Sequence, residues 1–185
     1  MMNLSDILNR THPLSFEDCN CLENIFQEVK LTKGSILFNQ DKTERKFYFI
    51  KKGIARAFTT ADGDEITFWF GQEGDPILSI NSYISNQASY ETIELLEDAV
   101  LYETSNQQLN ELYETNINIC NWGRKLAENE LIKTEQRFIA RLTGNSKKRY
   151  EGLIKSYPAL LNRVQLGYIA SYLGITQVSL SRIRK

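Results

Sequence analysis

Histidine is almost absent from this sequence of 185 residues, which contains only His12. Most zinc, copper and non-haem iron sites in proteins draw on several His, Cys or carboxylate ligands. Acid–base catalysis by histidine would depend on this one residue, close to the N-terminus. We therefore expect no metal site, no cofactor of that kind and no enzyme activity.

Cysteine and long apolar runs are also scarce. The three cysteines, Cys19, Cys21 and Cys120, are an odd number, which favours reduced thiols over a disulfide framework. No apolar run approaches the ~18 residues of a membrane span. The first residues, MMNLSDILNRTHPLSF, lack the basic region and apolar stretch of an export signal. The sequence predicts a cytoplasmic protein with no membrane partner.

The composition is that of an ordinary folded protein. Hydrophobic residues make up 42% and charged residues 24%, close to the ~45–50% and ~25% of soluble domains. At ~100–200 residues per domain, the length corresponds to one domain, or to one domain with a small addition. Global disorder is excluded.

The net charge of −1 conceals a strong asymmetry along the chain. Residues 133–185 hold 11 Lys and Arg against two acids, a net charge of +9, whereas residues 1–132 hold 11 basic and 21 acidic residues, a net charge of −10. Clustered basic residues release counterions when they meet phosphates, so such a segment indicates nucleic acid or an anionic surface. A solvated basic helix face is the alternative that charge alone leaves open.

The first two thirds of the chain change from helical to strand-like patterns. Residues 4–30 carry apolar side chains at three- and four-residue spacing and predict two short helices, with Val29 in the second pattern. From residue 31 to residue 103 follow the β-rich runs SILF, KFYFI, IARAFTT, EITFWF, YETIEL and AVLYET. Gly53 and Asp62-Gly63 supply the backbone freedom that tight reversals require. An antiparallel roll is expected.

A long helical stretch follows, over residues 106–141. Apolar side chains recur on one 3-4-spaced row, formed by Tyr113, Ile117, Cys120, Ala127, Leu131 and Phe138, and no proline interrupts it. A helix of ~35 residues spans about 50 Å, too long for one small roll to cover. We expect part of its face to meet another subunit; the alternative is that the row packs only against its own roll.

The basic C-terminal segment predicts a helix-turn-helix. Gly144-Asn145-Ser146 interrupts the helical pattern. After it, the spacing predicts one helix over 147–155 and two further helices within residues 166–185. The inward positions of this pair are apolar or small: Ile169, Ala170, Leu173, Ile175, Leu180 and Ile183. Gly174 turns the chain, and Thr176 is a good N-cap for the second helix.

The second of these helices displays groups suited to DNA. The outward side chains are Gln177, Ser179, Ser181, Arg182, Arg184 and Lys185. In a major groove, arginine can bind guanine with two hydrogen bonds and glutamine can bind adenine. An ordinary helical hairpin is the alternative.

In this order, the segments resemble the Crp-Fnr transcription regulators. LTKGSILF and FYFIKKGIARAF resemble the opening strands of the cyclic-nucleotide-binding jelly roll, and EITFWFGQEGD the strand and Gly-Asp turn before the ligand cassette. The resemblance covers residues 31–185. It implies an α+β fold with a sensor over 1–105, a dimerisation helix over 106–142 and a helix-turn-helix domain over 143–185. It further implies a homodimer on a two-fold DNA site and contact with RNA polymerase. The family usually continues beyond the position of Lys185 into a wing or a further basic turn, so the C-terminal segment here is either truncated or minimal.

The resemblance breaks down at the effector cassette. Family members that bind cyclic AMP carry Gly-Glu for the ribose and Arg-Ser for the phosphate, and these pairs fall on Leu78-Ser79 and Ala88-Ser89 here. Without the arginine, the phosphate loses its charged partner. We expect the roll to bind a different small molecule or none. The candidate effector residues are Ser79, Ser82, Ser89 and Tyr90, although serines of this kind also form turns.

The resemblance also assigns roles in the second helix. Gln177, Val178 and Arg182 fall where some family members read bases with Arg, Glu and Arg, so only Arg182 is retained and the recognised sequence should differ. Thr176 and Ser179 fall at positions suited to phosphate contacts. The alternative function is a small-ligand sensor whose terminal helices bind a protein partner instead of DNA.

Overall fold

The computed structural model describes residues 2–184. Two short helices come first, α1 (Leu4–Thr11) and α2 (Phe16–Asn24), as the apolar spacing predicted. Asn3 and Ser15 cap their N-termini by accepting hydrogen bonds from backbone N–H groups in the first turn. The second helix is shorter than expected, because Val29 lies in a strand and pairs with Leu101.

Two antiparallel sheets of four strands form the roll. One sheet has the order β1 (Gln27–Leu31), β8 (Ala99–Ser105), β3 (Lys46–Lys52) and β6 (Pro76–Ile77). The other has the order β2 (Ile36–Phe38), β7 (Thr92–Leu95), β4 (Ala55–Ala61) and β5 (Asp64–Gly71), with β5 at its edge. The predicted antiparallel jelly roll is confirmed, and β1 and β6 are the strands that the sequence patterns did not show.

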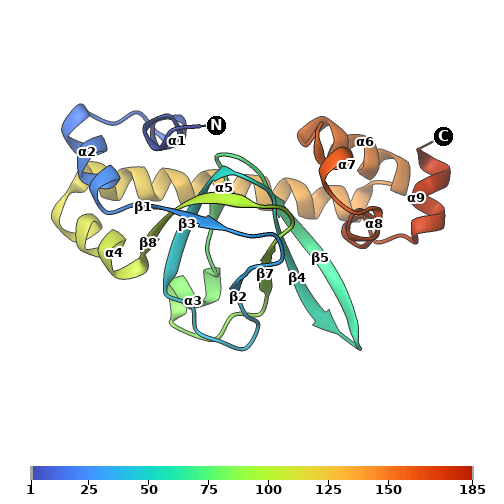
Figure 1. Cartoon of the computed structure of the whole chain (residues 1–185). Helices are drawn as coiled ribbons and strands as arrows, with labels where there is room; N and C mark the ends of the chain where they lie inside the picture. The colour runs from blue at the N-terminus through green and yellow to red at the C-terminus, as the bar shows by residue number, and fades with distance from the viewer. Residues whose placement is uncertain (1, 185) are drawn as a thin grey trace.

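The two sheets enclose an apolar core. Its buried members come from both sheets and include Phe38, Tyr48, Ile50, Ile77, Ile93, Leu95 and Leu101. The hairpin between β4 and β5 turns at Asp62 and Gly63, whose φ angles are 55° and 87°. Both residues have positive φ, as a type I′ hairpin turn requires. This hairpin extends beyond the rest of the roll, on the same side of the molecule as the C-terminal helices (Figure 1).

The predicted single helix over 106–141 is wrong in one respect, because the structure divides it into α4 (Asn106–Thr115) and α5 (Ile117–Thr143). The break is at Asn116, which has extended backbone angles of φ −134° and ψ 108°. The Asn116 side chain accepts hydrogen bonds from the N–H groups of Asn118 and Ile119 and donates one to Asp18. An asparagine cap thus starts a new helix where the apolar row by itself predicts continuation.

The C-terminal segment folds into four helices. They are α6 (Ser146–Ser156), α7 (Leu160–Arg163), α8 (Leu166–Leu173) and α9 (Gln177–Ile183). Helix α7 was not expected from the sequence. The predicted helix-turn-helix corresponds to α8 and α9, joined at Gly174 with φ 64°. We call helices α6 to α9 the head.

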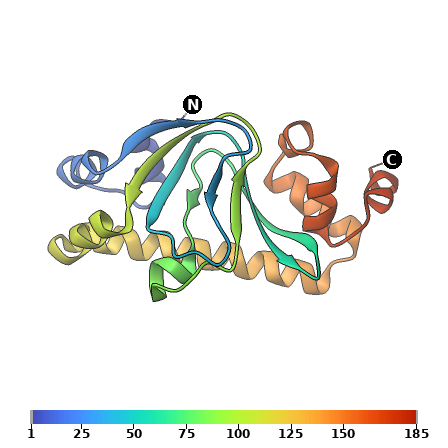
Figure 2. The ribbon, with the colours of Figure 1, turned by 60° about the horizontal axis from the view of Figure 1, so that its bottom comes forward.

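Helix α5 connects the parts of the molecule. It runs along one side of the roll and carries the head at its C-terminal end, while α1, α2 and α4 lie at the opposite end (Figures 1 and 2). Within residues 2–184, none of the helices is long and apolar enough to cross a membrane. In the same described part of the chain, His, Cys, Asp and Glu side chains form no group of three that could hold a metal ion.

Candidate nucleic-acid interface

The turn before α9 has the geometry expected of a helix-turn-helix. Thr176 is the N-cap of α9, and its hydroxyl accepts a hydrogen bond from the Ser179 N–H at 3.1 Å. Gly174 sits at the end of α8 in the left-handed region, which suits glycine. The Gln177 side chain covers Gly167 so closely that a Cβ there would lie 2.6 Å from Gln177 Nε2. Small side chains in α8 therefore let α9 cross at short range.

The face of α9 that was predicted to meet DNA is open to solvent. Thr176, Gln177, Ser181, Arg182 and Arg184 are exposed, and Ser179 is half-buried beside the cap. Val178 is 62% exposed between them. Lys185 lies outside the described residues. On the opposite side Leu180 is fully buried, so the helix presents amide, hydroxyl and guanidinium groups outward and an apolar side inward.

The basic residues at the start of α6 divide into two kinds. Lys147 and Lys148 are exposed at the N-terminus of this helix. Arg149 instead donates from Nε to the Leu173 carbonyl at 3.2 Å and from Nη1 to the Gly144 carbonyl at 2.5 Å. It therefore ties α6 to the end of α8, a contact that the sequence did not reveal.

The second half of α5 carries an uncovered apolar face. Its largest members are Leu131, Phe138 and Leu142, which are 69%, 62% and 68% exposed, and Ile132 and Ile139 flank them. The spacing between the three is seven and four residues, so they share one side of the helix. We call these five residues the α5 apolar face. The first half of α5 is different, because Ile119 and Trp122 are fully buried against the N-terminal helices.

The candidate effector residues lie around α3 (Ile80–Ser85) and the loop before β7. Ser82 accepts from the Glu44 N–H and donates to the Gln87 carbonyl, so both of its bonds hold loop backbone. Ser89 likewise bonds to the Glu91 N–H and carbonyl. Ser79 is buried, whereas Tyr90 is 51% exposed. The structure thus brings the three serines into one buried region and leaves the tyrosine at its surface.

The segment 57–123 supplies no cation for a phosphate ligand, and Lys42, whose carbonyl accepts a hydrogen bond from the Ser89 N–H at 2.8 Å, belongs to the neighbouring loop. No Lys, Arg or His occurs anywhere in residues 57–123, which include the whole cassette. The buried ionisable group there is the carboxyl of Glu91. Burial raises its pKa, while the nearby hydroxyls of Ser79 and Ser89 act in the opposite direction. An ionised Glu91 carboxylate would repel a phosphate beside it, and the same segment supplies no cation to offset that repulsion.

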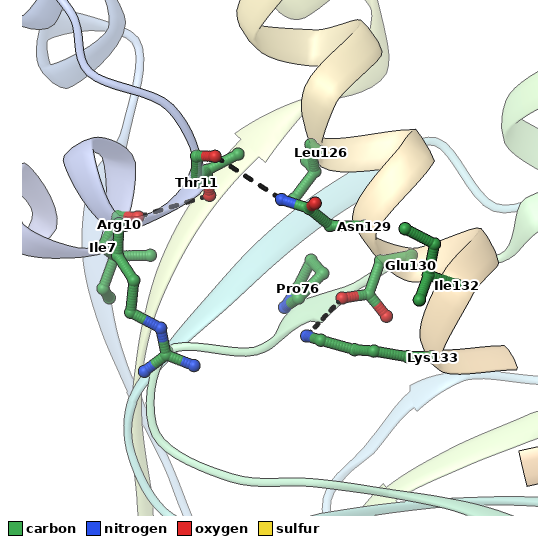
Figure 3. Close-up of a pocket in the computed structure, with 10 residues that line it drawn as sticks. Ile7, Arg10, Thr11, Pro76, Leu126, Asn129, Glu130, Ile132 and Lys133 are labelled. Carbon is green, nitrogen blue, oxygen red and sulfur yellow. Dashed lines mark hydrogen bonds and ion pairs between the residues drawn. The ribbon is translucent and has the colours of Figure 1, made fainter. Parts of the chain in front are cut away.

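A hollow of about 270 Å³ lies outside the roll, between α1, the turn before β6 and α5 (Figure 3). Some of its polar groups pair with one another: Asn129 donates to the Thr11 carbonyl at 3.4 Å, and Lys133 lies 2.6 Å from Glu130. Lys133 also lies 3.5 Å from Asp75. Arg10 also lines the hollow.

Sequence reasoning missed the residues that join the head to the roll. Arg56 and Arg163 each contact two carboxylates, and Ser171 bonds to the backbone of β5. Arg56 stands alone as a cation within the apolar run IARAFTT, which was the one available signal. Arg163 and Ser171 gave no signal, because their partners are far away in the sequence.

Comparison with known proteins shows where the described geometry recurs. A family model described as the cyclic nucleotide-binding domain matches residues 28–116. No curated protein matches the chain in sequence. Among solved structures, FixK2 from Bradyrhizobium japonicum aligns with a TM-score of 0.71 and 16% identity, over 86% of this chain and 83% of that one.

Two further structures give the same result. The catabolite activator protein of Thermus thermophilus aligns with a TM-score of 0.61 and 17% identity, over 96% of this chain and 84% of that one. CLP from Xanthomonas campestris, described as a c-di-GMP responsive global regulator, aligns with a TM-score of 0.68 and 13% identity, over 90% and 88%. At these identities the likeness shows a shared fold, and it extends over 86–96% of this chain and 83–88% of the others.

Proposed function

Since residues 28–116 match the cyclic nucleotide-binding domain and the chain has the fold of the Crp-Fnr transcription regulators, we propose that it is a homodimeric, DNA-binding transcriptional regulator. Residues 1–105 form its sensor, 106–142 its dimerisation segment and 143–185 its DNA-binding domain. Helix α9 is the recognition helix, and Arg182 and Gln177 read bases.

The exposed polar face of α9 is the observation that carries this proposal. Gln177 and Arg182 are open to solvent on a helix that follows a tight turn, in a segment with a net charge of +9. Thr176 and Ser179 lie at its N-terminus, where backbone N–H groups and hydroxyls suit phosphate oxygens. Val178 cannot hydrogen-bond, and it suits contact with a thymine methyl group.

Dimerisation is supported by the α5 apolar face. Three large side chains more than 60% exposed on one side of a helix are costly to leave in water, since each fully buried side chain of this size is worth roughly 1.5–3 kcal/mol. A second copy of α5 packed against this face buries the same residues from both chains. Two heads then face a two-fold DNA site.

The effector of the proposed regulator is not a cyclic nucleotide. Ser82 and Ser89 are engaged with loop backbone, and residues 57–123 contain no Lys, Arg or His that could pair with a phosphate. A neutral ligand, or none, fits this region. Calorimetry with cyclic AMP should detect millimolar or weaker affinity, whereas micromolar binding would overturn this part of the proposal.

DNA binding is tested by fluorescence anisotropy of a mixed-sequence 40-base-pair duplex at several salt concentrations. We expect log K to fall with log salt by several units, since each phosphate contact contributes a slope of about −0.9. Arg182→Ala should weaken binding and relax sequence preference, at a cost of about 1–3 kcal/mol on preferred sequences. Lys33→Ala, which removes an exposed cation from the roll, is the matched control and should bind as the wild type does.

Absence of binding at low salt, with or without added cell metabolites, would contradict the proposal. So would equal losses for Arg182→Ala and Lys33→Ala. Either result would favour the alternative in which the basic head serves a protein partner.

A further inference from the structure

The head packs against the roll and shares an apolar core with it. Ile54, Phe70 and Leu96 of the roll are buried in one cluster with Leu160, Val164, Ile169, Ala170, Leu173 and Leu180 of the head. The Phe70 and Tyr172 rings lie 5.3 Å apart. A continuous apolar core of this kind resists relative motion of the two parts, because separation exposes both sides to water.

Helix α8 also occupies the free edge of the second sheet. β5 is the edge strand, so its outer N–H and C=O groups lack a neighbouring strand. Ser171 supplies both missing partners: its hydroxyl accepts from the Thr67 N–H at 2.9 Å and donates to the Glu65 carbonyl at 2.9 Å. One side chain of the head therefore continues the hydrogen bonding of the sheet. These two bonds anchor α8 at one position along β5.

A buried arginine forms the second contact. Arg56 is 1% exposed on β4 and forms ion pairs with Glu65 at 2.5 Å and Glu94 at 2.6 Å. Its guanidinium is stacked between Phe58 of the roll, at 4.1 Å, and Tyr168 of α8, at 3.7 Å. The Tyr168 ring thereby covers a charge that the roll alone leaves open on one side.

Arg163 at the end of α7 makes the third contact. It donates from Nη1 and Nη2 to the two carboxylate oxygens of Glu73, at 3.1 and 2.7 Å, and from Nε to Glu97 at 3.2 Å. Nη2 bonds to Glu97 as well. Glu73 and Glu97 lie in two different turns of the roll, so the single Arg163 guanidinium binds both of these turns. Its fork geometry sets direction as well as distance.

These contacts leave the recognition surface open. The polar contacts use α7 and α8, and α9 joins the shared core only through the buried Leu180, whereas Gln177, Arg182 and Arg184 stay exposed. The docking therefore fixes the direction of α9 without covering it.

We propose that Arg163, with Tyr168 and Ser171, is a positioning residue for DNA recognition: by docking the head on the roll, it fixes the separation and orientation of the two recognition helices in the dimer. This inference rests on the proposed function. A dimer reads two half-sites about 34–36 Å apart, and a head that pivots on its linker accepts other separations at a cost in affinity. The linker between α5 and the head consists of Gly144 and Asn145. The orientation of the head relative to the roll therefore depends mainly on the docking contacts.

The test selects bound duplexes from a pool with 40 randomised base pairs and compares half-site spacing between variants. The wild type should enrich two-fold sites of one spacing. Arg163→Gln should enrich several spacings and bind the wild-type sequence about five-fold more weakly, as expected for one partly exposed ion-pair network. Arg163→Lys should keep the single spacing better, since it retains the charge near both carboxylates.

Two controls separate positioning from charge and from stability. Lys155→Gln removes an equal charge from the exposed side of α6 and should keep one spacing. Ser171→Ala should speed hydrogen exchange at the Thr67 N–H and broaden the spacing without changing the head's own core. Circular dichroism and thermal melting should show that each variant is folded. If Arg163→Gln does not fold, the half-site spacing selected by Ser171→Ala tests the positioning role.

The outcomes distinguish this inference from the function on which it rests. If the wild type enriches no sequence and does not bind DNA at low salt, the proposed function fails. If the wild type enriches a single spacing and both Arg163→Gln and Ser171→Ala keep it with unchanged affinity, DNA binding stands and the positioning role is wrong. Tighter DNA binding by either variant would also overturn it, since docking would then oppose recognition.

Discussion

At the scale of single residues, Glu73 shows how the docking contact depends on charge. Burial acts to raise the pKa of its carboxyl, but hydrogen bonds from Arg163 and the Gly53 N–H outweigh this and hold the pKa at about 2. The ordinary value is 4.5. A carboxyl with a depressed pKa stabilises the fold above its unfolded pKa, and this contribution is lost as the pH falls toward the folded value.

Glu73→Gln should therefore lower stability by a constant amount at pH above about 5, and the difference from the wild type should shrink between pH 4.5 and 2. Urea unfolding at a series of pH values measures this difference. A difference that is unchanged down to pH 2 would mean that the Glu73 carboxylate is not held by Arg163.

Local chemistry made several residues predictable from sequence. Thr176 as a cap, Gly174 as a turn and the Asp62-Gly63 hairpin depend only on the backbone preferences of those residues, and the structure confirms each. Arg163 and Ser171 could not be found in this way, because their partners lie 66 to 106 residues away in sequence. Thr176, Gln177, Ser181, Arg182 and Arg184 are exposed, and the DNA contacts expected of them stay a prediction.

At the scale of elements, the break between α4 and α5 depends on one asparagine. Asn116 caps α5 and also donates to the buried Asp18 carboxylate at 2.6 Å. The pKa of Asp18 is lowered, first by the Ser15 hydroxyl and then by Asn116. The apolar row that runs through both helices concealed this break, since the periodicity of side chains says nothing about a cap within it.

Asn116→Ala should cost about 1–2 kcal/mol of unfolding free energy, because the cap and one partner of Asp18 are lost together. Chemical denaturation measures the change. Gln107→Ala, which removes one exposed side-chain pair from α4, is the control and should cost a few tenths of a kcal/mol. Equal costs for the two variants would show that Asn116 does not hold the junction.

The strands were predictable where β-rich apolar runs were bounded by turn residues, as in β3, β4 and β5. Strand β1 was not predicted, because Val29 continues the helical spacing of the residues before it. Its strand conformation depends on pairing with β8. Such tertiary pairing overrides local preference.

At the scale of the whole molecule, the α5 apolar face sets the expected assembly. Phe138→Glu places a charge in the centre of that face and should convert the dimer into a monomer, as measured by sedimentation velocity. Gln136→Glu adds the same charge on the other side of the helix and should leave the dimer intact. Identical sedimentation of both variants would place the interface elsewhere.

The central claim is that two chains, joined through α5, bind one DNA duplex through their α9 helices. Native mass spectrometry of the protein mixed with a 40-base-pair duplex selected by the wild type tests it directly. The predicted complex contains two chains per duplex, and Arg182→Ala and Phe138→Glu should each deplete it. A complex with one chain per duplex, or none at any protein concentration, would contradict the account.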